Sequence, residues 1–124
     1  MQTREQRFAA RVYELVHRRN GTYSHQTDRN KYGAMAHKLP VLIRSAGLAQ
    51  ALEFAATRSD AQKDVYADLV TALDMGDLRE RSRQAHLPEY MWLTEQALAA
   101  LLWFKRYAES VLGVTAEAEG GGHD

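Results

Sequence analysis

Apolar residues recur at helical spacing along most of this 124-residue chain. The clearest case covers residues 32–46, where one helix face would carry Tyr32, Met35, Ala36, Leu39, Leu42, Ile43 and Ala46. This face keeps its phase across Pro40, which removes a backbone donor and disfavours helix in the residue before it, so we expect a kink or break near Leu39. Gly47 suits the left-handed conformation just past a helix end, and a second apolar stripe begins at Leu48.

The same pattern, combined with capping residues, predicts six helices. We place them at about residues 4–19, 30–46, 48–57, 60–75, 78–85 and 88–112. Thr3 with Gln6 and Ser59 with Gln62 form capping-box patterns, in which two side chains satisfy free backbone donors at a helix start. Gly76 is the expected stop of the fourth helix. The polar residues 21–29 are expected to form a loop.

Composition favours an all-α fold. Alanine and leucine, which favour helices, number 33, whereas valine and isoleucine, which favour strands, number 8. We therefore expect a compact helical bundle of about five to six helices with a long C-terminal helix, folded as one domain over residues 1–112. Residues 113–124 are acidic and glycine-rich, and we expect them to form a disordered tail.

Several classes of protein are excluded or disfavoured. The chain has no cysteine, which rules out disulfides, thiolate metal sites and a cysteine nucleophile. The first residues carry interspersed arginines and no continuous apolar segment, so they do not form a signal peptide. The longest apolar run, residues 97–104, is too short to span a bilayer. We expect a soluble, cytoplasmic protein.

The net charge of zero conceals an asymmetry. Residues 1–58 carry ten basic and four acidic side chains, for a net charge of +6, and residues 59–124 carry six basic and twelve acidic ones, for −6. Three interpretations remain open: a face that binds a polyanion, head-to-tail contact between copies, or an ordinary solvated surface.

The last predicted helix is apolar on nearly all sides. Such a helix is central in its bundle, or it presents a partner surface where part of it faces outward. We expect core packing as its main role; if part of the helix faces outward, Trp92 and Trp103 are the residues expected at that edge. Lys105 and Arg106 are expected to complement the dipole at the helix end, with RNA contact as the alternative.

The first predicted helix carries a row of arginines. Arg4, Arg7, Arg11 and Arg18 fall within a stripe about 60° wide. Such a row suits a phosphate backbone, because guanidinium groups are always charged and planar. Arg19 and Lys31 extend the charge toward the following segment. The alternatives are a solubilising outer face and a row that pairs with acidic residues of a neighbouring protein.

The chain offers no pattern that requires catalysis. Asp60, Asp64 and Asp68 are spaced i, i+4, i+8, and such a ladder could collect Mg²⁺ for a nuclease. We interpret it as the solvated side of an amphipathic helix, because apolar residues occupy the opposite face. The five histidines lack metal-ligand spacing, and no phosphate-binding loop is present. We therefore predict no catalytic residue, no metal site and no cofactor.

Two blocks of residues carry a family resemblance. The first contains Tyr32-Gly33, His37-Lys38-Leu39-Pro40, Leu42-Ile43-Arg44, Gly47 to Leu52 and Phe54-Ala55. The second contains Tyr90, Thr94 to Leu98 and Leu102 to Glu109. Together, in this order and spacing, they resemble the small helical subunit of type III-B CRISPR effector complexes, the Cmr complexes. The resemblance covers roughly residues 3–112.

The resemblance implies a structural role in an RNA-targeting ribonucleoprotein. Members of that family stack in several copies along a guide–target RNA duplex, and cleavage belongs to other subunits. The implied partners are the other subunits of the complex, copies of this chain, and guide and target RNA. Residues expected to contact RNA or a neighbouring subunit are Arg4, Arg7, Arg11, Arg18, Arg19, Lys31, Lys38 and Arg44. The alternative is a helical adaptor that binds only protein through its last helix; a metal-dependent nuclease is a third possibility.

Overall fold

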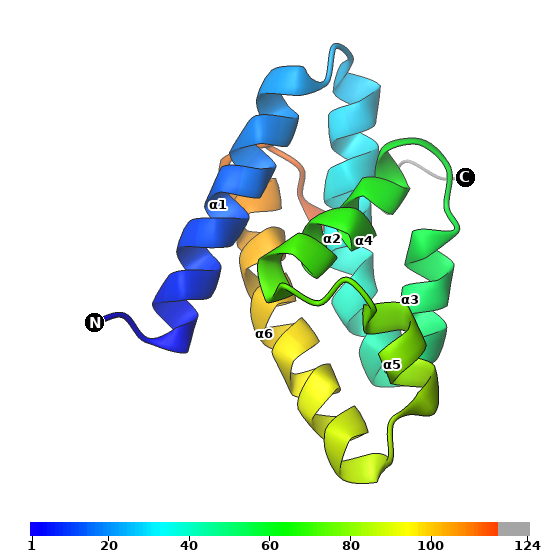
Figure 1. Cartoon of the computed structure of the whole chain (residues 1–124). Helices are drawn as coiled ribbons and strands as arrows, with labels where there is room; N and C mark the ends of the chain where they lie inside the picture. The colour runs from blue at the N-terminus through cyan, green and yellow to red at the C-terminus, as the bar shows by residue number, and fades with distance from the viewer. Residues whose placement is uncertain (117–124) are drawn as a thin grey trace.

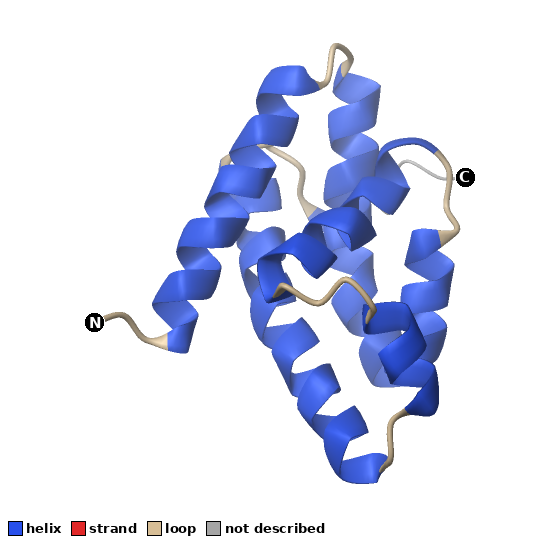
Figure 2. Ribbon diagram, in the orientation of Figure 1, coloured by secondary structure: helices blue, strands red, loops and turns tan. Residues whose placement is uncertain are grey.

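The computed structural model describes residues 1–116, which form six helices and no strand (Figures 1 and 2). The helices are α1 (Arg4–Thr22), α2 (Gln26–Ala46), α3 (Leu48–Ala56), α4 (Asp60–Leu73), α5 (Leu78–Gln84) and α6 (Leu87–Ser110). The prediction of an all-α bundle with a long last helix is confirmed. None of these helices combines the length and apolar character that crossing a bilayer requires.

Helix α2 lies at the centre of the packing. It contacts α6, α4 and α3, whereas α1 packs against α6 and α4, and the short α5 packs against α3 (Figure 1). Helix α6 is more one-sided than its composition suggests. It buries Leu93, Leu101 and Phe104, but Trp92 and Leu102 are exposed. Helix α6 packs against α1, α2, α3 and α4, so it shares the centre of the bundle with α2 and leaves only its outer side exposed.

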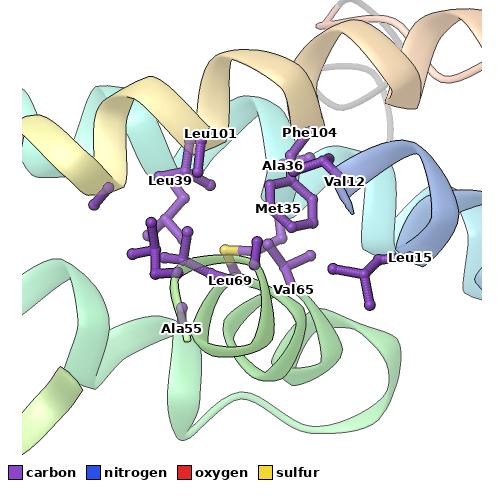
Figure 3. Packing of buried hydrophobic residues seen from close by; sticks show 14 of the residues in the cluster. Val12, Leu15, Met35, Ala36, Leu39, Ala55, Val65, Leu69, Leu101 and Phe104 are labelled. Carbon is purple, nitrogen blue, oxygen red and sulfur yellow. The ribbon is translucent and has the colours of Figure 1, made fainter. Parts of the chain in front are cut away.

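The core joins buried side chains from all six helices. Figure 3 shows Met35 and Leu39 of α2 next to side chains from α4, α6 and α1. The labelled partners in that view include Val65, Leu69, Leu101, Phe104, Val12 and Leu15. All of these side chains are buried, and burial of each large aliphatic or aromatic group stabilises the fold by about 1.5–3 kcal/mol.

Two predicted helix signals are confirmed and two are wrong. Thr3 and Gln6 form the expected capping box, with distances of 3.1 and 2.8 Å between side-chain oxygens and backbone nitrogens. Gly47 has a φ of +93°, which a residue with a side chain rarely adopts. Ser59, in contrast, makes no side-chain cap. Helix α4 ends at Asp74, whose φ is +55°, and not at Gly76.

The connection between α1 and α2 is shorter than predicted. The expected loop at residues 21–29 is reduced to 23–25, because α1 continues to Thr22 and α2 begins at Gln26. Arg29 fastens this connection by donating to the carbonyl oxygens of Asn20 (3.0 Å) and Tyr23 (2.6 Å). Helix α2 is also continuous through Pro40, so the alternative of a helix break there is wrong.

The folded part of the chain extends past the predicted boundary at residue 112. Val114 is 1% exposed, and its carbonyl oxygen accepts a hydrogen bond from His37 Nε2 at 2.9 Å. The start of the predicted tail is therefore packed against α2. The rest of that tail, residues 117–124, lies outside the described residues.

Candidate nucleic-acid and subunit interface

The four arginines of the predicted stripe lie exposed on one flank of α1. Arg4 approaches the Phe8 ring, with 5.9 Å between the guanidinium carbon and the ring centroid. Arg7 Nη1 donates to the Gln2 carbonyl oxygen at 3.0 Å. Each of these contacts uses only part of a guanidinium group, which has five N–H donors. The charged ends of both residues remain open to an external anion.

Arg11 connects this flank to α4. Its Nη1 donates to the Ala72 carbonyl oxygen at 3.0 Å, one residue before the helix ends at Leu73. A cation there satisfies a terminal carbonyl and complements the negative end of the helix dipole. Arg11 and Arg18 both line a shallow hollow of about 400 Å³ between α1 and α4. The hollow also contains Ala10, Glu14, Leu15, Thr71 and Ala72.

Arg19 differs from the other arginines because it points into the bundle. Its Nε and Nη2 atoms lie 2.9 and 2.8 Å from the two carboxylate oxygens of Asp68, which is 4% exposed. Its Nη1 lies 3.5 Å from Asp64. This two-pronged ion pair occupies the planar fork of the guanidinium. Arg19 therefore holds α1 to α4 instead of belonging to the exposed stripe.

Two tyrosines complete this ion-pair network. Tyr23 and Tyr32 donate their hydroxyl protons to Asp64 and Asp68, each at 2.6 Å. Burial raises the pKa of both phenols above the ordinary value, and the hydrogen bonds to the neighbouring carboxylates add to the rise. The hydrogen bond with Asp68 raises the pKa of the Arg19 guanidinium. The network thus consists of neutral phenols and a fixed ion pair.

This arrangement corrects the interpretation of the aspartate ladder. Asp64 and Asp68 face α1 and α2 and are not a solvated row. Only Asp60 is exposed, and it pairs with Lys31 at 3.0 Å. Among the described residues, no group of three or more histidine, aspartate or glutamate side chains could hold a metal ion.

The remaining predicted contacts lie on α2, away from the α1 stripe. Lys31 pairs with Asp60 at the first residue of α4, whereas Arg11 binds Ala72 near the other end of that helix, about 18 Å away along its axis. The Lys38 ammonium is 5.8 Å from the centre of the Phe54 ring of α3. Arg44 lies exposed in the last turn of α2. The predicted residues therefore form one cluster on α1 and three separate positions on α2.

Sequence reasoning missed the roles of Tyr23, Tyr32 and Arg29. Tyr32 carried a usable signal, because it lies on an apolar face and its buried hydroxyl must find a partner. Asp68 carried one too, because its position falls inside the buried stripe that Val65, Leu69 and Ala72 define on α4. A buried phenol and a buried carboxylate in the same core are natural partners.

Comparison with known proteins agrees with this architecture. Residues 4–111 match the family model described as CRISPR-associated protein (Cas_Cmr5). A protein of Thermus thermophilus described as CRISPR system Cmr subunit Cmr5 is 42% identical over 116 residues, which cover 90% of this chain and 98% of that protein.

A solved structure shows the same fold. The crystal structure of a CRISPR-associated Cmr5 family protein from Thermus thermophilus superposes with a TM-score of 0.81 and 41% sequence identity. The superposition covers 90% of this chain and 98% of that one. The match therefore extends over nearly all of both chains and includes the helices that carry the arginine stripe and the ion-pair network.

Proposed function

Because this chain belongs to the Cmr5 family of CRISPR-associated proteins, we propose that it is a non-catalytic structural subunit of a cytoplasmic type III-B RNA-targeting complex that serves antiviral defence. The observation that carries the proposal is the match over residues 4–111, together with a relative of nearly equal length described as a Cmr subunit. In this role the chain binds other subunits of the complex and supplies shape and charge, while other proteins perform the chemistry.

The arginine stripe supports a path for RNA along α1. Arg4 and Arg18 are separated by about 21 Å along the helix axis, so one copy presents cations over several nucleotides. Several copies stacked along the complex would extend this row. Arg4, Arg7, Arg11 and Arg18 then contact phosphates of guide or target RNA, a sequence-independent interaction that suits a subunit lining every target.

The opposite charges of the two halves support contact between copies. The first half of the chain, which contains α1 to α3, has a net charge of +6, and residues 59–124 have a net charge of −6. Lys38 and Arg44, on the basic half, are proposed contacts to a neighbouring subunit or RNA. Opposite charges on two copies would set the orientation of stacked subunits and raise association rates.

A specific observation favours the second candidate function, an adaptor that binds only protein. The start of α6 and the junction of α2 with α3 enclose an open groove of about 780 Å³. Leu87, Met91 and Trp92 line it with exposed apolar surface, which typically marks a protein contact. In the adaptor function this groove docks a partner and the arginines only solubilise the subunit.

Co-purification tests the proposal directly. The full chain, carrying an affinity tag, is expected to bring down the other Cmr subunits together with guide RNA. A Trp92→Ala variant and a variant with the four stripe arginines changed to glutamate separate the two candidates. Loss of protein partners only in Trp92→Ala, with RNA affinity of the complex independent of the arginines, would establish the adaptor. A chain that never joins the complex would refute both.

A further inference from the structure

Four aromatic side chains gather on the surface where α1 meets α6. The Tyr13 and His17 rings are stacked with centroids 5.5 Å apart and an interplanar angle of 9°. Tyr13 meets Tyr107 edge to face at 5.4 Å, and Tyr107 lies 5.7 Å from Trp103. The four rings form a continuous row from one helix to the other, on the side where α1 and α6 pack together (Figure 1).

Only part of this row contributes to the packing of α1 against α6. Tyr107 and Trp103 are half-buried against the core, and desolvation raises the pKa of the Tyr107 phenol. Tyr13, in contrast, is 44% exposed, and His17 is exposed as well. The Tyr13–His17 stack therefore extends the buried rings into solvent and leaves flat aromatic surface uncovered.

One exposed cation lies close to the α6 end of the row. Arg106 lies one helical turn after Trp103, is exposed, and forms no ion pair with another residue of the described range 1–116. It lies well before the end of α6 at Ser110, so the expected role at the helix end does not account for it. Glu14 lies one helical turn before His17, between the row and the hollow that α1 forms with α4.

We propose that Tyr13 and His17, supported by Tyr107 and Trp103, form a platform on which an unpaired base of single-stranded RNA stacks, with Arg106 binding the adjoining phosphate. The proposal rests on the RNA-lining function proposed above and adds a second, uncharged mode of contact. Bases stack on exposed aromatic rings regardless of sequence, because every base has a flat π face. The parallel rings of Tyr13 and His17 beside a cation suit a base and its phosphate.

The platform and the arginine stripe occupy different flanks of α1. Arg11 contacts α4, whereas Tyr13 contacts α6. An RNA strand held by the stripe would thus have to pass over the outer surface of α1 to place a base on Tyr13 and His17. The platform therefore takes a base flipped away from a paired region, or a strand end, and not the bases inside a duplex.

The test uses the complex reconstituted with the full chain and a single-stranded target RNA at two salt concentrations. A Tyr13→Ala, His17→Ala double variant is expected to weaken RNA binding by about fivefold or more at both salts, because stacking is uncharged and loses little to ions. Tyr13→Phe is expected to retain wild-type binding. This variant is the matched control, because it keeps the ring and removes only the hydroxyl group.

Abasic RNA tests whether the contact is made to a base. A target of the same length and charge that lacks bases at the unpaired positions is expected to bind wild type and double variant equally. If the double variant instead fails to enter the complex, the row is a protein contact and the proposal is wrong. If it enters the complex and binds RNA as wild type does, the proposal is also wrong. Changing the four stripe arginines to glutamate is expected to alter the salt dependence of RNA binding, whereas the double variant is not. The two measurements therefore distinguish a failure of the stacking proposal from a failure of the function proposed above.

Discussion

Val114 packs directly over Gly33. A Cβ atom added to Gly33 would lie 2.5 Å from the Val114 Cβ and 2.7 Å from its Cγ1, closer than real carbon atoms approach. Glycine inside a helix costs about 1 kcal/mol relative to alanine. Here the missing side chain lets the segment after α6 reach α2, where Val114 is buried and binds His37.

The first prediction follows from this contact. Gly33→Ala is expected to destabilise the fold by about 1–3 kcal/mol, despite the higher helix propensity of alanine, because the new methyl group forces Val114 away. Adding Val114→Gly, which removes all three atoms that the new methyl group meets, should restore part of that loss, since the two sites share one space. Urea unfolding of both single variants and the double variant measures the coupling. Additive losses would contradict it.

Two truncations test where the folded domain ends. A chain ending at Leu112 loses Val114 and leaves His37 Nε2 without its acceptor. We expect its free energy of unfolding to be lower than that of the full chain by roughly 2–4 kcal/mol. A chain ending at Ala116 keeps both contacts and removes residues whose sequence has almost no apolar side chains. Its melting temperature should remain close to that of the full chain. Equal melting temperatures for the two truncations would place the boundary at 112 after all.

The aspartate ladder makes a prediction with its own control. Asp68→Ala leaves Tyr32 without a partner inside the bundle and leaves Arg19 with only its longer contact to Asp64. We expect a loss of about 2–4 kcal/mol, less than for a fully buried pair because Arg19 is partly solvated. Asp60→Ala removes only the exposed pair with Lys31 and should cost about 0–1 kcal/mol. Chemical unfolding compares the two. Similar small losses would restore the interpretation of a solvated ladder.

Alkaline pH should weaken the same network. The folded-state pKa values of Tyr23 and Tyr32 are raised above the ordinary value of 10.0. Above about pH 10 the unfolded chain releases these phenolic protons and the folded chain keeps them, so the unfolding free energy falls by about 1.4 kcal/mol per pH unit for each tyrosine. Tyr32→Phe should be less stable at pH 8 but decline less steeply above pH 10. Parallel curves for wild type and Tyr32→Phe would exclude Tyr32 as a source of the slope.

Local signals predicted much of the fold, and long-range pairing explains most of what they missed. The capping box at Thr3 and the positive φ at Gly47 were predictable because each depends on neighbouring residues. Arg19 points inward because it pairs with Asp68, which lies 49 residues away in sequence, and no local pattern predicts such a pairing. Val114 was assigned to a tail because its neighbours are polar, although its partner Gly33 lies in the second helix.

The same limit applies to the candidate site. The helical spacing of Arg4, Arg7, Arg11 and Arg18 correctly placed them on one exposed flank, since side-chain direction on a helix is a local property. Adjacent position alone suggested that Arg19 extends the row, and its pairing with Asp68 shows that it does not. Whether the exposed flank binds RNA depends on the assembled complex, which a single chain does not contain.

The arginine stripe carries the most direct prediction about function. Changing Arg4, Arg7, Arg11 and Arg18 to glutamate should leave the fold nearly intact, because all four side chains are exposed and only Arg11 bonds to another helix. RNA binding by the reconstituted complex should weaken strongly, and each lost phosphate contact should flatten the log–log salt slope by about 0.7 for a single strand. Binding by isolated subunits is a poor substitute, because a few contacts per copy become effective only when many copies share one RNA. Arg19 must be left unchanged, since its loss would unfold the ion-pair network and imitate a binding defect. Unchanged affinity and slope, with failed incorporation, would make the stripe a protein–protein surface; no change in either would reduce it to solubilising charge.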